Sequence, residues 1–110
     1  MDFAQGVHEI TEDWPKREHY GLANQVRRAA ASVPANIAEG HGRTGPKEFL
    51  HQLSVAVGSP HEAETYLLLA QRLRYIADDT CETLLSQADE VGRILGGLIR
   101  RLRPPASPNA

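Results

Sequence analysis

The last third of the sequence repeats apolar residues at intervals of three or four positions, which is the period of one face of an α-helix. The members of this series are Leu84, Ala88, Val91, Leu95, Leu98 and Leu102. No segment shows the alternation of apolar and polar residues that is typical of a β-strand. Helices with one apolar face bury it by packing against other helices. The sequence therefore predicts an all-α fold.

Breaks in this period divide the chain into four predicted helices. The first ends before Trp14, the second covers about 22–39, the third covers about 44–76, and the fourth extends from Asp79 through the series above. Because the connections are short, consecutive helices should run in opposite directions. We expect an antiparallel up-down four-helix bundle.

Two prolines should distort this bundle. Pro34 lies within the second predicted helix, where it removes an N–H donor and clashes with the carbonyl of Ala30. The expected result is a Pro-kinked second helix. Residues 58–60, with the sequence Gly-Ser-Pro, weaken the middle of the third predicted helix, which we expect to bend there.

Length and composition indicate one globular domain. The chain has 110 residues, of which 41% are apolar and 24% are charged, as in an ordinary soluble protein. Residues 1–103 should form a single four-helix bundle domain, and 104–110 a flexible C-terminal tail. Cys81 is the single cysteine, so no disulfide framework is possible within one chain. No apolar run is long enough to span a membrane, and we expect a cytoplasmic protein.

A line of polar residues follows one side of the second predicted helix, beside its apolar face, when residues are placed at intervals of 100°. With a neighbouring arginine it forms the candidate binding or assembly surface, which consists of Arg27, Arg28, Ser32, Asn36, Glu39 and Arg43. Two interpretations are open. The side chains either satisfy one another and tie the glycine-rich turn at 40–45 to the bundle, or they grip a phosphate or the polar groups of a partner.

The remaining side of this helix is small and nearly uncharged, which is unusual for the outer surface of a bundle. Small side chains let another helix approach closely, and we therefore predict a homo-oligomer. The candidate subunit interface consists of Ala31, Pro34, Ala35 and Ala38, and Ala23 extends it toward the start of the helix. The alternative interpretation is that alanine serves only helix propensity.

One motif suggests metal chemistry. Glu48 and His51 form an E-x-x-H pair, a spacing found in bundles that hold two metal ions. Such a site needs a second pair, and the fourth predicted helix contains no histidine, so a di-metal bundle enzyme is only a second alternative. Ser32 has no histidine at helical spacing that could activate it. We predict no enzyme: no catalytic residue, no metal or other cofactor, and no small-molecule substrate.

The formal net charge of −2 conceals two basic segments, 22–47 and 91–110. Joined on one surface, they would contact phosphate groups. Only 5% of the residues are aromatic, so a nucleic acid would be held by its backbone rather than by stacked bases. A nucleic-acid-binding protein that uses these basic patches is the first alternative.

Several segments, in order and spacing, resemble a known family. They are Tyr20–Leu22, Gln25–Ala29, Pro34–Gly40, Gly42–Arg43, Glu48–Phe49 and Ala56–Ser59. Over about 10–76 the chain resembles the four-helix-bundle proteins encoded in intervening sequences of bacterial 23S rRNA. The resemblance implies a four-helix bundle, and related bundles assemble as pentameric rings. It also links the chain to accessory proteins of diversity-generating retroelements, which bind nucleic acid and a reverse transcriptase.

The cellular role of this family is not established, so the resemblance implies no activity. The first predicted helix looks shorter than is usual in the family, which leaves open whether Met1 is the true start. We expect a non-enzymatic, homo-oligomeric helical bundle, a pentamer if it follows the resemblance, that acts as a binding or scaffolding module. Its further partner would be a nucleic acid or a protein, and it would not bind a membrane.

Overall fold

The computed structural model describes residues 2–41 and 45–102, apart from the side chains at positions 2, 38–41 and 46. Within these ranges every regular element is helical, which confirms the prediction of an all-α bundle. The elements are α1 (Asp2–Thr11), the 3-10 turn η1 (Lys16–Glu18), α2 (Leu22–His41), α3 (Pro46–Ala56), α4 (Gly58–Arg72) and α5 (Asp78–Leu102). The predicted tail, 104–110, lies outside the described residues.

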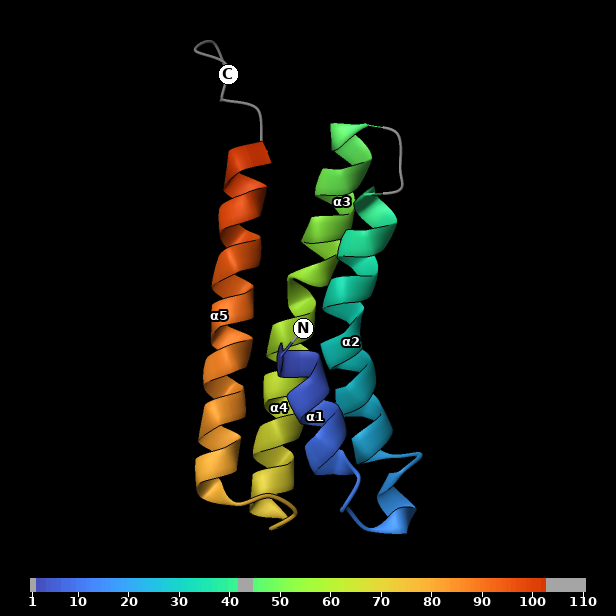
Figure 1. Ribbon diagram of the computed structural model, residues 1–110, viewed down its shortest axis with the longest axis vertical. Helices are drawn as coiled ribbons and strands as arrows, with labels where there is room; N and C mark the ends of the chain where they lie inside the picture. Colours follow the sequence, from blue (N-terminus) through green and yellow to red (C-terminus); the bar gives the residue numbers. More distant parts are fainter. Residues whose placement is uncertain (1, 42–44, 103–110) are drawn as a thin grey trace.

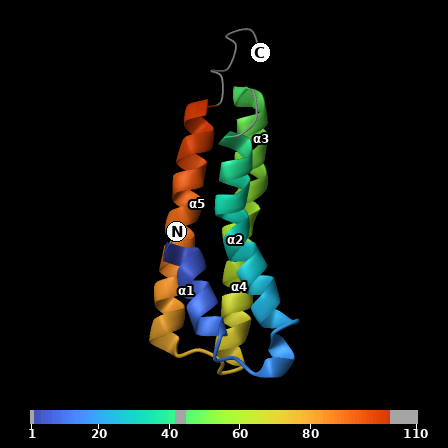
Figure 2. The same cartoon turned by 45° about the vertical axis from the view of Figure 1, so that its right-hand side comes forward.

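The helices lie side by side along one long axis (Figure 1). In that view α2 begins at the lower end, α3 begins at the upper end and leads down into α4, and α5 returns to the upper end. The ten-residue α1 lies beside the lower half only, where it packs on both α2 and α5 (Figure 2). Within the described residues, no helix has the length and apolar character needed to cross a membrane.

Apolar side chains pack into two clusters, one in each half of the bundle. The lower cluster, between α1, α2, α4 and α5, includes Phe3, Val7, Val26, Leu67 and Leu84. The upper cluster, between α2, α3 and α5, includes Val33, Leu53, Ala56, Leu95 and Ile99. Because α1 is only about 15 Å long at 1.5 Å per residue, four helices surround the lower cluster, whereas three of the described helices surround the upper one.

The third predicted helix is divided in two at Val57, directly before the expected weak segment 58–60. The backbone still turns helically there, and the Val57 N–H donates to the carbonyl of Leu53 at 3.1 Å. Pro60 follows as the third residue of α4, a position where a helix N–H has no partner within the helix. The break therefore lies where the missing N–H of proline costs least. The second part ends at Arg72, earlier than the predicted end near Ile76.

The α4–α5 connection closes α4 with a Schellman turn. The N–H of Tyr75 donates to the carbonyl of Ala70 at 2.9 Å, and the N–H of Arg74 donates to the carbonyl of Gln71 at 3.0 Å. Arg74 has a φ of 62°, the left-handed conformation that glycine usually supplies. The ring of Tyr75 then packs against that of Trp14, with centroids 5.6 Å apart, so the turn holds the α1–α2 connection.

Pro34 lies inside α2, which continues to His41. Its side chain is half-buried. The kink that the sequence predicts at this residue stays a prediction.

Candidate interaction surface on α2 and α4

Arg27 of α2 is engaged within the chain. Its Nε donates a hydrogen bond to the Oγ1 of Thr11 at 2.5 Å. Thr11 is fully buried at the end of α1, and its hydroxyl points to the carbonyls of Val7 and His8, both at 2.9 Å. Arg27 therefore joins α2 to α1, and no pattern in the sequence indicated that Thr11 is its partner.

Ser32 and Asn36 form a second link, between α2 and α4. Ser59, which is buried at the start of α4, donates its hydroxyl to the Oγ of Ser32 at 2.8 Å. The Nδ2 of Asn36 donates to the carbonyl and to the Oγ of Ser32, at 2.7 and 3.0 Å. These three side chains satisfy one another across the two helices. Ser59 was not predicted as a site residue, although it belongs to the Gly-Ser-Pro segment.

Arg28 is exposed, and it forms no hydrogen bond or ion pair with any other residue that the structure describes. It borders a shallow groove of about 250 Å³ between the two helices, lined by Gln25, Arg28, Ala29 and Ser32 from α2 and by Ser59 and Glu62 from α4. The carboxylate of Glu62 accepts a hydrogen bond from the Tyr66 hydroxyl at 3.3 Å. The groove thus carries a positive charge on one wall and a negative charge on the other.

The candidate subunit interface divides into exposed and buried parts. Ala31 and Ala35 are exposed, and Pro34 is half-buried. Ala23 is fully buried in the lower cluster. Its assignment to the outer face was wrong, because α1 packs over that flank of α2. The side chains of Ala38 and Glu39, and the whole of Arg43, lie outside the described residues.

Two large apolar side chains at the C-terminal end of α4 are exposed. Leu69 is 45% exposed and Leu73 is 47% exposed. They follow Glu62 at intervals of seven and eleven residues, which places them on the same flank of α4. Neither leucine belongs to the core, because Ala63, Leu67 and Ala70 fill the core-facing side of α4, and Leu69 is turned about 100° away from Ala70.

The E-x-x-H pair lies on the outside of α3. Glu48 and His51 are both exposed, and the Glu48 carboxylate lies back over Gly45, 2.8 Å from the position that a Cβ would take there. A carboxylate at this position is favourable beside the N-terminus of a helix. Among residues 2–41 and 45–102, no three His, Cys, Asp or Glu side chains come close enough together to hold a metal ion.

Arg27 and Arg28 of the first basic segment do not meet the arginines of the second segment. Arg27 and Arg28 lie near the start of α2, at the lower end of the bundle, whereas Arg100 and Arg101 lie near the end of α5, at the upper end (Figure 1). Arg103 lies outside the described residues. Within the part of the chain described, a single phosphate-contacting patch that joins Arg27 and Arg28 with Arg100 and Arg101 of the same chain is therefore absent.

Comparisons with known proteins agree on the family and the fold. Residues 1–97 match the model of a family described as 23S rRNA-intervening sequence protein. A solved structure of a protein of unknown function, from the S23 ribosomal protein family of Bacteroides thetaiotaomicron, has a TM-score of 0.78 and 22% sequence identity. The alignment covers 90% of this chain and 93% of that chain. No curated protein matches the sequence. The chain belongs to the 23S rRNA-intervening sequence protein family.

Proposed function

We propose that this protein is a non-enzymatic, cytoplasmic, homo-oligomeric bundle that acts as a binding or scaffolding module. One observation carries the proposal. The half-exposed Leu69 and Leu73, at the C-terminal end of α4, and the exposed Ala31 and Ala35, on the outer side of α2, form two separate surface patches of one chain. Exposed large apolar side chains and a small, uncharged helix face are both typical of protein interfaces.

The leucine patch, formed by Leu69 and Leu73, and the alanine patch, formed by Ala31 and Ala35, differ in shape. The leucines project from α4, whereas the alanines leave α2 open to close approach. In our proposal, the leucines of one subunit pack on the alanine face of the next, and such a head-to-tail contact closes into a ring. Burying the exposed half of each leucine would contribute about 1 kcal/mol. Arg28 and Glu62, which flank the groove between the patches, would supply polar contacts at the rim.

Five subunits are the expected size of the ring, on the resemblance to bundles that form pentamers. Light scattering on the eluting protein tests this. At physiological salt, which screens exposed charge pairs, the wild-type protein should have a mass near five times the 12.1 kDa of the chain. Ala35→Glu and Leu69→Glu should each reduce the mass to that of a smaller species, with the helical circular dichroism unchanged. Ala77→Glu adds the same charge at an exposed alanine outside both patches and should leave the ring intact. An unchanged mass in the first two variants would contradict the proposal.

The same experiment separates a protein scaffold from a nucleic-acid-binding accessory protein. Arg28, Arg100 and Arg101 are exposed, and a ring would repeat each of them, so that weak phosphate contacts add. A particle that gains mass with a mixture of RNA and DNA, loses the gain as salt rises, and fails to show it with Arg28→Ala would identify nucleic acid as the partner. A ring whose mass does not change when nucleic acid is added supports the protein scaffold. The link to retroelement accessory proteins would gain support only from the first result.

A further inference from the structure

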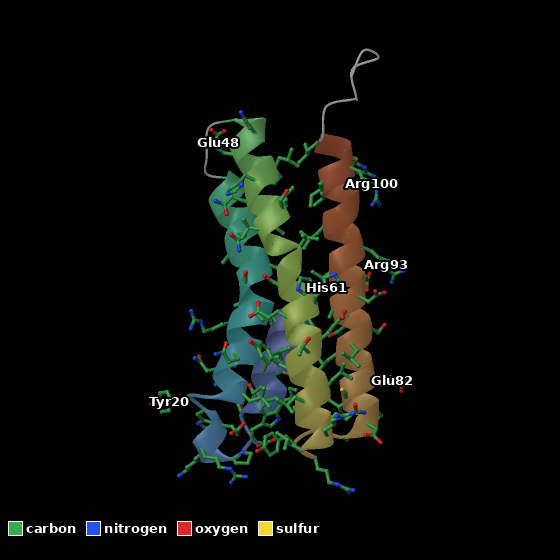
Figure 3. All side chains as sticks on the ribbon, turned by 180° about the vertical axis from the view of Figure 1, so that it is seen from behind. Tyr20, Glu48, His61, Glu82, Arg93 and Arg100 are labelled. Atoms are coloured by element: carbon green, nitrogen blue, oxygen red, sulfur yellow. The ribbon has the colours of Figure 1, made fainter. Side chains whose placement is uncertain are left out.

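The outer side of α5 carries a regular polar seam. Its residues follow one another at intervals of four, three, four, three and four positions, which keeps them on one side of the helix. They are Glu82, Ser86, Asp89, Arg93, Gly96 and Arg100, and we call them the α5 seam. None of them is buried. Seen from behind in Figure 3, Glu82, Arg93 and Arg100 all project from the same edge of α5, away from the bundle.

Charge changes sign half-way along the α5 seam. The carboxylates of Glu82 and Asp89 lie in its N-terminal half, and the guanidinium groups of Arg93 and Arg100 lie in its C-terminal half. A helix with this distribution is complementary to a second copy of itself that runs in the opposite direction. In an antiparallel pair, alternating spacings of four and three bring each seam residue of one copy opposite a seam residue of the other copy. The complementarity therefore holds for each such facing pair, which we call a layer.

We propose that two copies of this chain pair along the α5 seam, antiparallel and about a two-fold axis. In this register Glu82 faces Arg100 of the second copy, and Asp89 faces Arg93 of the second copy. Ser86 faces Gly96 of the second copy. The two-fold axis repeats each pairing, so every charged layer joins opposite charges and no layer joins like charges.

The surroundings of the α5 seam leave room for a second helix. A groove of about 410 Å³ runs between α4 and α5. Its α5 wall includes Gly92 and Gly96, and a Cβ at Gly92 would meet nothing within 4 Å. On the α4 side, His61 borders the groove, and Leu68 follows it at a spacing of seven residues with 48% of its surface exposed. Small residues permit close approach, and Leu68 supplies an apolar contact beside the ion pairs.

The outer layers should carry most of the attraction. Arg93 already pairs with Asp89 of its own chain at 3.3 Å. Dimerisation would therefore replace this ion pair with the equivalent pair between the two copies and add no new one. Glu82 and Arg100 form no ion pair with another described residue. They are 18 positions apart, about 27 Å along the helix at 1.5 Å per residue, and cannot reach each other within one chain. A Glu82–Arg100 contact can therefore form only between two copies of the chain.

This contact is independent of the proposed ring, because it uses α5 rather than the α2 and α4 patches. Sedimentation equilibrium at low salt, in the full chain and in an Ala35→Glu background, tests it. The Ala35→Glu protein should form a dimer. Glu82→Arg and Arg100→Glu, each alone in that background, place like charges opposite each other and should weaken the dimer at least about tenfold.

Mixing the two single variants should restore the dimer, because the arginine introduced at position 82 of one chain then meets the glutamate introduced at position 100 of the other. The double variant Glu82→Arg/Arg100→Glu should form the dimer without a second protein. Glu90→Arg and Arg101→Glu make the same charge changes outside the α5 seam and should leave the dimer intact.

Two results would overturn the proposal: a monomeric Ala35→Glu protein at low salt and about 1 mM chain, or a mixture that associates no better than its components. The ring proposal fails separately, if Ala35→Glu leaves the mass of the wild-type assembly unchanged.

Discussion

The guanidinium of Arg27 in α2 donates a hydrogen bond to the buried hydroxyl of Thr11 at the end of α1. Arg27 is half-buried, whereas the adjacent Arg28 is exposed and contacts the groove between α2 and α4. Two arginines next to each other in the sequence thus have different environments. One holds the short first helix on the bundle, and the other faces solvent, where a partner can reach it.

Removing the Arg27 side chain should destabilise the fold. A hydrogen bond from a charged donor to a buried hydroxyl predicts a loss of about 1–2 kcal/mol in the free energy of unfolding of Arg27→Ala. A double-mutant cycle of Arg27→Ala and Thr11→Val should give a coupling energy of about 1 kcal/mol between the two side chains. Urea unfolding measures both quantities. Arg28→Ala is the matched control and should change stability by less than about 0.5 kcal/mol. Equal losses in the two arginine variants would mean that the contact with Thr11 contributes nothing.

The link between Ser59 and Ser32 predicts a second stability difference. Ser59→Ala removes a buried hydroxyl that donates to Ser32 at 2.8 Å, and it should cost about 1 kcal/mol. The loss should be smaller when Ser32 is already alanine, since the acceptor is then gone. Ser54 is a suitable control, because its exposed hydroxyl bonds only to Leu50 within its own helix. Thermal unfolding of Ser54→Ala should match the wild-type curve, and a Ser59→Ala curve that also matches it would contradict the prediction.

Glycine at position 74 should stabilise the protein. Arg74 adopts the left-handed conformation in the Schellman turn after α4, at a cost of about 1 kcal/mol that glycine avoids. Because glycine also gains freedom in the unfolded chain, the net gain of Arg74→Gly should be about 0.5 kcal/mol. Calorimetry should show a higher Tm. Arg72→Gly, two residues earlier and still inside α4, should lower the Tm, because glycine costs a helix about 1 kcal/mol. A lower Tm in both variants would show that the turn does not need glycine.

The sequence predicted the helices well because their apolar period is a local property. The series that starts at Leu84 places Ala88 and Leu95 in the core, as observed. It could not predict which neighbour lies at a given angle around α2. The helical period predicts the side of α2 on which Arg27 lies, but Thr11 is its partner only because α1 packs against that side.

The same limit applies to the candidate interaction surface. Leu69 and Leu73 have the residue type of a core position, and an interface between subunits selects the same residue type. The spacing of residues indicates the side of a helix on which they lie. Whether that side faces the core of its own chain or a partner depends on the packing of α2 and α4, which no local pattern contains.

Alkaline pH should destabilise the protein through Cys81. Burial, and after it the carboxylates of Asp78 and Glu82, raise the pKa of the Cys81 thiol above its ordinary value of 9.0. Burial favours the neutral, protonated thiol in the folded state. The thiol of the unfolded chain therefore loses its proton at a lower pH than the thiol of the folded chain. This contribution to stability is therefore fully present below the unfolded pKa and is lost as pH rises through the folded pKa.

The measurement compares urea midpoints of the wild-type protein and Cys81→Ala from pH 7 to just below 10, the ordinary pKa of tyrosine. That upper limit matters because burial and the Glu62 carboxylate also raise the pKa of Tyr66, which adds a second loss at higher pH. Above pH 9 the wild-type protein should lose stability faster than Cys81→Ala, by up to about 1.4 kcal/mol per pH unit. The alanine variant starts lower at pH 7, because it leaves a small cavity beside Leu67, whose carbonyl accepts from the thiol at 3.7 Å. The two curves should therefore converge as pH rises, and parallel curves would show that the thiol does not titrate with unfolding.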